Sequence, residues 1–297
     1  THHTLGDGAY NNFKAISESA CCVSTNLTPD NVIEEMERVI REALRLSAPA
    51  YISVPMDLAR RPIIGSPIKG VSLAEIKRTK SDPETLEAAL NFVLDKISAS
   101  KNIVSLPTQL ITNYGLSNIF LEFLKKSNIA YATSPMDKGI VSEGHPGYLG
   151  IYNGQGSSPP ELKALIENAD LILDIGGIIL EDYNTTFWTD NLNSKKMITL
   201  GDHFVRMGDT VFSGVSLDDM LIGLTKQIGK LARISTTNPQ TVLPLLGSSV
   251  DLTNSQNFYP RLQRMLKSGD VLVIETGTSA CVISAICSSA KPPTLTA

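Results

Sequence analysis

Apolar residues recur at helical spacing in the first well-patterned segment of the chain. The preceding residues 1–26 are polar and predict irregular structure, and Thr28-Pro29-Asp30 is typical of a helix start. Pro49 ends the helix, and residues 50–54 predict a strand. A single strand would leave its backbone groups unpaired, so we expect the last unit of an α/β layer whose earlier strands are absent. The helical stripe consists of Val32, Met36, Val39, Ile40, Ala43 and Leu44.

Between residues 82 and 228 the chain alternates between helical and strand patterns. Apolar positions recur every three or four residues in the helical segments and run continuously through the short strand segments. Short connections between alternating helices and strands are typical of a parallel sheet with helices on both faces, so we predict an α/β, doubly wound domain. The predicted helices cover about 86–97, 116–126, 159–168 and 216–228, and the predicted strands cover 102–106, 129–133, 171–175 and 196–200.

Two segments rich in Pro, Gly, Ser and Thr, residues 60–81 and 229–250, predict linkers between domains. Residues 1–59 lie before them, and residues 251–297 after them are too few to bury a core of their own. The last segment contains a helical pattern at 254–266 and a strand pattern at 271–274. We therefore expect a complete middle domain at 82–228, flanked by two partial α/β domains.

Composition and charge exclude several classes of function. The net charge of -4, with arginines 38–45 interspersed with glutamates, predicts a solvated helix face and no nucleic-acid partner. No apolar run approaches the roughly 18 residues of a membrane span, and we see no secretory signal. The cysteines form two loose groups without zinc-ligand spacing, so we expect no metal site in this chain. They are expected to be reduced thiols in a cytoplasmic protein. They are Cys21, Cys22, Cys281 and Cys287.

The string His2-His3-Thr4-Leu5-Gly6-Asp7-Gly8 is the most specific in the chain. Two adjacent imidazoles can act as acid, base or proton shuttle near neutral pH. Two surface histidines, or residual vector sequence, would give the same string. Gly6-Asp7-Gly8, with Asn31 downstream, could suggest a diphosphate and metal loop. Nothing strand-like precedes Gly6, so we interpret it as a turn.

Two further glycine-containing segments could approach a ligand. Gly154-Gln155-Gly156 lacks the third glycine of a dinucleotide fingerprint, so we expect a tight loop with Ser157 or Ser158 capping the next helix. Residues 275–279 follow a predicted strand, where open α/β sheets bind ligands. There Gly277 allows close approach, and the hydroxyls of Thr278 and Ser279 can donate to a phosphate. We interpret His145 and His203 as structural.

The order of these motifs resembles the thiamine diphosphate-dependent 2-oxoacid decarboxylases of the pyruvate and indolepyruvate decarboxylase type. The resemblance runs from Thr1 to Ala280. It comprises His-His-Thr-Leu-Gly-Asp-Gly at 2–8, Val-Pro-Met-Asp at 54–57, Pro-Met-Asp-Lys-Gly at 135–139 with His145-Pro146 and Gly150-Ile151-Tyr152, Asp-Leu-Ile-Leu-Asp-Ile-Gly at 170–176 and Glu-Thr-Gly-Thr-Ser-Ala at 275–280.

The resemblance implies a function for the parent enzyme and roles for five residues. Such an enzyme converts a small 2-oxoacid, of the pyruvate or indolepyruvate class, to an aldehyde and CO2 with thiamine diphosphate and Mg2+, as a homodimer or homotetramer. His2 and His3 match paired active-site histidines, which act on the substrate carboxylate and on the reaction intermediate. Thr278 matches a residue that contacts the cofactor, with Gly277 and Ser279 beside it.

The sequence also departs from this family. The cofactor-binding glutamate would lie upstream of Thr1 and the magnesium loop downstream of Ala297, and Cys281-Val282 replaces an aromatic-glycine pair. We therefore expect an internal fragment, inactive by itself. Two alternatives stay open: an acetolactate synthase-like carboligase whose middle domain holds a flavin, which the histidine pair disfavours, and a non-catalytic module for subunit contacts.

Overall fold

The computed structural model of the chain describes residues 4–63, 76, 78–229, 255–267, 270–275, 277 and 294–296. The chain divides into two compact units, Thr1–Thr79 and Lys80–Ala297. The predicted linkers at 60–81 and 229–250 lie largely outside the described residues, the second almost entirely.

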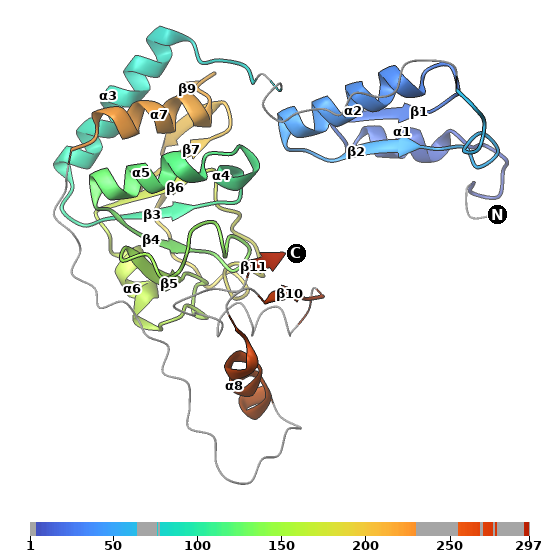
Figure 1. Cartoon of the computed structure of the whole chain (residues 1–297). Helices are drawn as coiled ribbons and strands as arrows, with labels where there is room; N and C mark the ends of the chain where they lie inside the picture. The colour runs from blue at the N-terminus through green and yellow to red at the C-terminus, as the bar shows by residue number, and fades with distance from the viewer. Residues whose placement is uncertain are drawn as a thin grey trace. The chain divides into compact units, whose positions relative to one another are not determined.

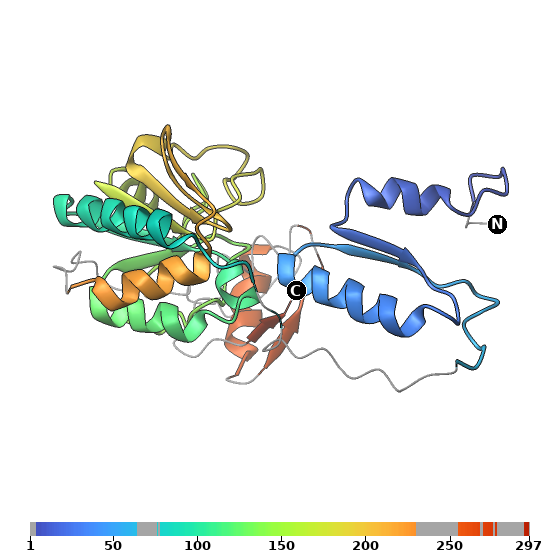
Figure 2. The same ribbon diagram turned by 90° about the horizontal axis from the view of Figure 1, so that it is seen from above.

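The first unit is a two-stranded parallel sheet with a helix on each side. Helix α1 (Asn12–Glu18), strand β1 (Val23–Asn26), helix α2 (Val32–Leu46) and strand β2 (Ala50–Ser53) follow in order. The strands pair with Val23 beside Ala50 and Asn26 beside Ser53, and Figure 2 shows α1 and α2 on opposite sides of them. The strand predicted at 50–54 is thus confirmed as β2, whereas the prediction that residues 1–26 are irregular was wrong, because α1 and β1 lie there. Four-residue β1 is too short for a periodic signal.

Helix α2 carries its charges as pairs along its own surface. Its arginines pair with glutamates three or four residues earlier, at distances of 2.6 to 2.8 Å. This confirms the prediction of a solvated helix face. The helix begins after Asn31, three residues later than Thr28, because the Asn31 side-chain oxygen accepts a hydrogen bond from Thr28 N at 2.8 Å and holds the turn before the helix.

The second unit contains a seven-stranded sheet that is parallel over its first five strands (Figure 1). The last two strands form an antiparallel hairpin on the β7 side. The predicted doubly wound α/β domain is thus confirmed as a mostly parallel sheet. In spatial order the strands are β5 (Tyr148–Ile151), β4 (Ala130–Thr133), β3 (Ile103–Pro107), β6 (Leu171–Ile175), β7 (Met197–Gly201), β8 (Phe204–Met207) and β9 (Thr210–Ser213).

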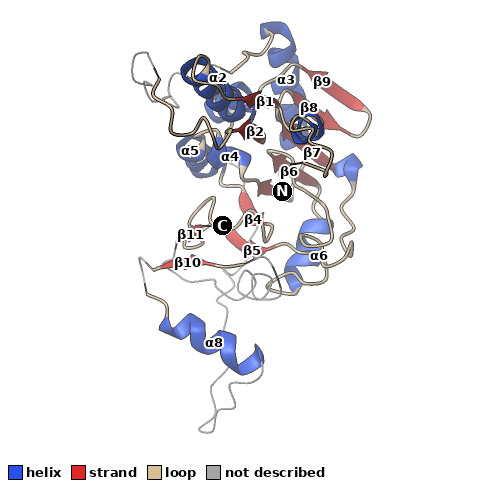
Figure 3. Cartoon of the chain, turned by 90° about the vertical axis from the view of Figure 1, so that its right-hand side faces the viewer, coloured by secondary structure: helices blue, strands red, loops and turns tan. Residues whose placement is uncertain are grey.

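Helices cover both faces of this sheet, and Figure 3 distinguishes the helices from the strands by colour. One apolar cluster joins α3 (Pro83–Ala99), α5 (Ser117–Ser127) and α7 (Leu217–Gln227) to one face. A second joins α6 (Glu161–Glu167) to the other. The unit also contains the short helix α4 (Leu110–Asn113) and the 3-10 turn η2 (Ser194–Lys196). None of the helices in the described part of the chain is long and apolar enough to cross a membrane.

Several elements of this unit were not predicted. Strands β5, β8 and β9 have four residues each, and β9 is mostly exposed, so their sequences lack the continuous apolar run that identified the central strands. The prediction that Ser157 or Ser158 caps α6 was wrong. The residue before α6 is Pro160, and the Ser157 hydroxyl donates instead to Gly154 O at 2.7 Å.

The last described residues form a small pair of strands and a helix. Helix α8 (Ser255–Met265) and strand β10 (Val271–Val273) agree with the predicted helix and strand, and β10 pairs in parallel with β11 (Thr294–Thr296). Tyr259 packs there against partly buried leucines and Ile274.

The turn after β6 is the tightest part of the large sheet. Gly176 has a φ of +114°, and a Cβ placed there would lie 1.9 Å from Thr108 Oγ1, which follows β3. Just before it, Asp174 is buried, and its Oδ1 accepts from Gly177 N at 3.1 Å and from Ile178 N at 2.7 Å. The close approach of the two strand ends therefore requires glycine at 176.

We expect Gly176→Ala to lower the free energy of unfolding by about 2 kcal/mol more than Gly177→Ala does. Gly177 is a matched control because it also has a positive φ, +85°, but the nearest atom to its Cβ would be 4.0 Å away. Adding Thr108→Ala should recover part of the loss, since it removes the closest atom. Denaturant unfolding of the parent chain and the three variants measures this, and equal losses at 176 and 177 would contradict the packing argument.

Asp174 should make the free energy of unfolding depend on pH. Burial raises the pKa of Asp174 from 3.8 to about 6. Its stabilising contribution is therefore complete below about pH 4 and is lost as pH rises through about 6. Asp174→Asn keeps an oxygen for the two backbone N–H groups but cannot titrate. Between about pH 4 and 7 the parent chain should lose about 2–3 kcal/mol relative to the variant. Parallel stability curves in denaturant titrations would refute this assignment.

Candidate functional site

The start of α1 lies at the carboxyl edge of the first sheet. Asn26, the last residue of β1, donates from Nδ2 to Oδ1 of Asn11, which precedes α1, at 3.1 Å. Parallel α/β sheets bind ligands outside the carboxyl ends of their strands. The residues that lead into α1 therefore reach the edge where this unit could hold a ligand.

Gly6-Asp7-Gly8 forms a turn on the way into α1. Asp7 Oδ1 accepts from Ala9 N at 3.0 Å, and its Oδ2 accepts from Asn12 Nδ2 at 3.1 Å. The hydrogen bond from Ala9 is the main reason that the pKa of Asp7 lies below its ordinary value. Asp7 thus serves the turn, as predicted. The predicted catalytic residues His2 and His3, which come just before this turn in sequence, lie outside the described residues.

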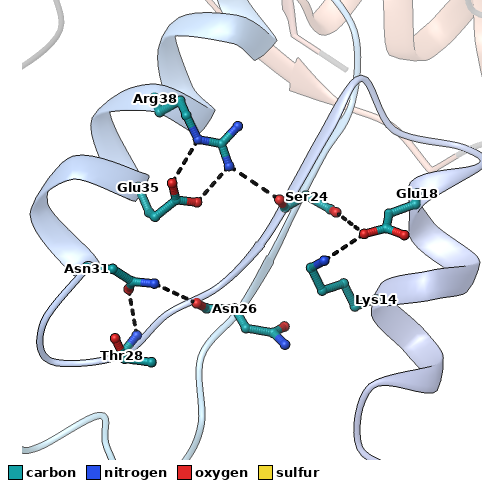
Figure 4. Close-up of polar contacts among 8 residues, drawn as sticks. All are labelled: Lys14, Glu18, Ser24, Asn26, Thr28, Asn31, Glu35 and Arg38. Atoms are coloured by element: carbon teal, nitrogen blue, oxygen red, sulfur yellow. Dashed lines mark hydrogen bonds and ion pairs between the residues drawn. The ribbon is translucent and has the colours of Figure 1, made fainter.

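A polar network joins α1, β1 and α2 next to this edge (Figure 4). Asn31 donates from Nδ2 to Asn26 O at 3.2 Å. Arg38 donates to both carboxylate oxygens of Glu35, and mainly for this reason the pKa of Glu35 falls to about 2. Glu18 accepts from Lys14 at 2.6 Å. Exposed ion pairs stabilise little individually. The contacts between elements are the bond from Asn31 to Asn26 O, a donation from Arg38 to Ser24 O at 3.5 Å and one from Ser24 Oγ to Glu18 at 3.3 Å.

The corresponding edge of the large sheet is closed by its own side chains. Between β3 and β6 the chain changes direction across the sheet, which is where doubly wound folds bind dinucleotides. Here Asp137 accepts from Gln109 N at 2.9 Å and from Ser134 Oγ at 2.5 Å, and burial raises its pKa. Gly176 packs against Thr108 at the same edge, so contacts within the chain join these strand ends.

The Pro-Met-Asp-Lys-Gly segment contributes a buried ion pair between β4 and β5. Lys138 and Glu143 pair with each other, and both side chains are 4% exposed. Burial raises the pKa of Glu143, against the opposing effect of Lys138. His145 accepts from Gly147 N at 3.1 Å and packs beside Tyr131, and His203 forms the turn between β7 and β8. These groups hold loops together.

The end of β10 is described only in part. Gly277 is exposed, and no atom would lie within 4 Å of a Cβ placed there, so its surroundings are open. Thr278 and Ser279 lie outside the described residues. Of the five predicted catalytic and cofactor-binding residues, only Gly277 thus lies within the described part of the chain.

The described residues do not by themselves fit thiamine diphosphate or a magnesium ion. Among them no group of three His, Cys, Asp or Glu side chains could hold a metal ion. The exposed Gly277 alone does not form a diphosphate site, so this geometry supports no catalytic step through the cofactor. Cys21 and Cys22 are free thiols, as predicted, and the other two cysteines lie outside the described part.

One exposed loop, between β6 and β7, was missed in the sequence. Thr186, Phe187 and Trp188 all have left-handed backbone conformations, with φ between +47° and +59°. Such conformations are costly for bulky residues and concentrate at functional positions. The Phe-Trp pair in a polar segment was the available signal.

Comparison with known proteins agrees with the fold. Residues 90–217 match the family model described as "Thiamine pyrophosphate enzyme, central domain". The chain is 28% identical over 283 residues to the "Probable pyruvate decarboxylase Pdc101" of Schizosaccharomyces pombe, covering 94% of this chain and 49% of that protein. It is 26% identical over 283 residues to "Pyruvate decarboxylase isozyme 3" of Saccharomyces cerevisiae, covering 94% of this chain and 50% of that protein.

A solved structure extends the comparison. Benzoylformate decarboxylase from Polynucleobacter necessarius superposes with a TM-score of 0.64 at 19% identity, covering 99% of this chain and 55% of that chain. The chain thus spans about half the length of the curated relatives it matches. Residues 90–217 are thus similar to the central domain of thiamine pyrophosphate enzymes, and nearly the whole chain is similar to about half of a pyruvate decarboxylase.

Proposed function

We propose that this chain is part of an enzyme that decarboxylates a 2-oxoacid without oxidation, using thiamine diphosphate and Mg2+. The observation that carries the proposal is the similarity to pyruvate decarboxylases over 94% of the chain. The substrate would be a small acid of the pyruvate or indolepyruvate class, and the products an aldehyde and CO2. The cofactor, when bound, would accept the electrons left by the departing CO2.

In this proposal His2 and His3 are the catalytic residues of the chain. The bonds from Asn26 to Asn11 and from Asn12 to Asp7 support it, because they hold the turn after these histidines at a ligand-binding edge. Their imidazoles would contact the substrate carboxylate and move a proton near neutral pH. Gly277, Thr278 and Ser279 would face the cofactor, and the metal ligands would come from outside this chain.

The parent enzyme would be a cytoplasmic homodimer or homotetramer. The free Cys21 and Cys22 are compatible with a reducing compartment. The alternative of a flavin-holding carboligase is disfavoured by the His2-His3 pair and by the missing third glycine of a dinucleotide fingerprint at Gly154-Gln155-Gly156. A non-catalytic module for subunit contacts would have the same fold but no histidine-dependent activity.

The isolated 297-residue chain should release no CO2 from pyruvate or indolepyruvate. The reason is that the described residues supply no metal-binding group and the chain matches only half the length of its relatives. The assay contains purified chain, thiamine diphosphate and Mg2+, with a pyruvate decarboxylase as positive control. Release that stops on chelation of the metal would contradict the prediction.

In a longer protein that contains this chain and the other half of the pyruvate decarboxylase sequence, His3→Gln should lower kcat about a hundredfold or more. The free energy of unfolding should change by only about 1 kcal/mol, because the segment around residue 3 is polar. His203→Asn is the control, since that histidine forms a turn in the other unit and its left-handed backbone suits asparagine. Near-normal turnover of His3→Gln, or activity that simply follows folding, would reject the catalytic role.

A further inference from the structure

Two loops at the carboxyl edge of the large sheet expose large apolar side chains. One follows β4 and contains Met136, and the other is the aromatic loop, residues 178–190. A hydrogen bond from Met136 N to Asn184 Oδ1, 3.2 Å, joins the two loops. Phe187 is 75% exposed and Trp188 65%. The further exposed apolar side chains of these loops are Met136, Ile179 and Leu180.

The aromatic loop is held firmly in this conformation. Thr186 N donates to Asn153 Oδ1 at 2.8 Å, Trp188 N donates to Thr185 Oγ1 at 2.7 Å, and Gln155 N donates to Thr189 Oγ1 at 2.8 Å. Asn184 and Thr185 of the same loop are fully buried. The two rings are therefore presented to solvent by a fixed backbone, which is the arrangement of a preformed binding surface.

The charge of the aromatic loop is entirely negative. Residues 178–190 contain Glu181, Asp182 and Asp190 but no Lys or Arg. None of these three carboxylates forms an ion pair within the described residues. A complementary partner should offer apolar side chains together with unpaired cations.

The chain itself contains a segment with these properties, the arginine turn, residues 54–63. Leu58 N and Ala59 N both donate to Pro55 O at 3.0 Å, so the segment has a defined turn. Met56 is 88% exposed, and Val54 and Ile63 are exposed as well. The exposed Arg60 and Arg61 form no ion pair within the described residues, unlike the paired arginines of α2.

We propose that the arginine turn of one copy of this chain binds the aromatic loop of a second copy. Because each copy carries both surfaces, a twofold dimer would form two equivalent contacts. In each contact Trp188 and Phe187 would bury against Met56 and its apolar neighbours, and the arginines would meet Glu181 and Asp182. This association does not depend on the proposed decarboxylation and is tested without measuring catalysis.

Trp188 is the only tryptophan in the chain, so its fluorescence reports this contact directly. The full chain is diluted from tens of micromolar to nanomolar while its mass is measured by sedimentation or light scattering. We expect a dimer at high concentration and a red shift of the emission that follows its dissociation. A monomer at all concentrations would overturn the proposal. So would an emission maximum already blue-shifted in the monomer, which would indicate a contact within one chain.

Substitutions test whether the arginine turn and the aromatic loop form the dimer contact. Arg60→Glu with Arg61→Glu should weaken dimerisation at least tenfold, and adding Glu181→Lys with Asp182→Lys should restore it, because the charges are then exchanged. Trp188→Ser, followed by mass alone, should also weaken it at least tenfold. Val211→Ser, an exposed valine on β9, is the matched control and should leave the dissociation constant unchanged. A dimer unaffected by the arginine and Trp188 substitutions, in variants with normal melting curves, would overturn the assignment.

Discussion

The large sheet depends on the burial of its two central strands from both sides. All five residues of β3 and all five of β6 are buried. Along β6, Leu171, Leu173 and Ile175 contact the cluster of α3, α5 and α7, whereas Ile172 contacts the cluster around α6. Neither set of helices could be removed without exposing one of these faces to water. Polar groups that could serve a ligand are therefore confined to the strand ends and loops.

The sequence predicted the parts of the fold whose signal is local. Strand β6 agrees with its predicted bounds, and the bounds of α5 and α7 differ from prediction by one residue. Strands β1, β5, β8 and β9 have only four residues each, and what stabilises them is pairing with distant partners. Pairing leaves little trace in a single sequence. The cap of α6 was mispredicted for a related reason, since Ser157 had a closer acceptor in its own loop.

For the candidate site, the sequence supplied residue types but not their surroundings. The turn at Gly6-Asp7-Gly8 could be foreseen because no strand precedes it, whereas its attachment to β1 through Asn11 and Asn26 depends on a contact fifteen residues apart. The Phe-Trp pair marked the loop at 186–188 in the sequence, but its left-handed conformations could not be predicted, because Thr, Phe and Trp adopt them and not glycine. Their conformation is set by hydrogen bonds to Asn153 and Thr185.

The buried pair of Lys138 and Glu143 has a consequence for how this sequence can vary. With both side chains 4% exposed, loss of either partner would leave a charge without compensation, at a cost of about 3–5 kcal/mol. Replacement of both by apolar residues of similar volume can be nearly neutral, yet it requires two changes whose intermediate is unstable. The two positions should therefore evolve together, so that related sequences keep both charges or lose both. A chimera that takes one position from a parent with both charges and the other from a parent with neither would fold poorly.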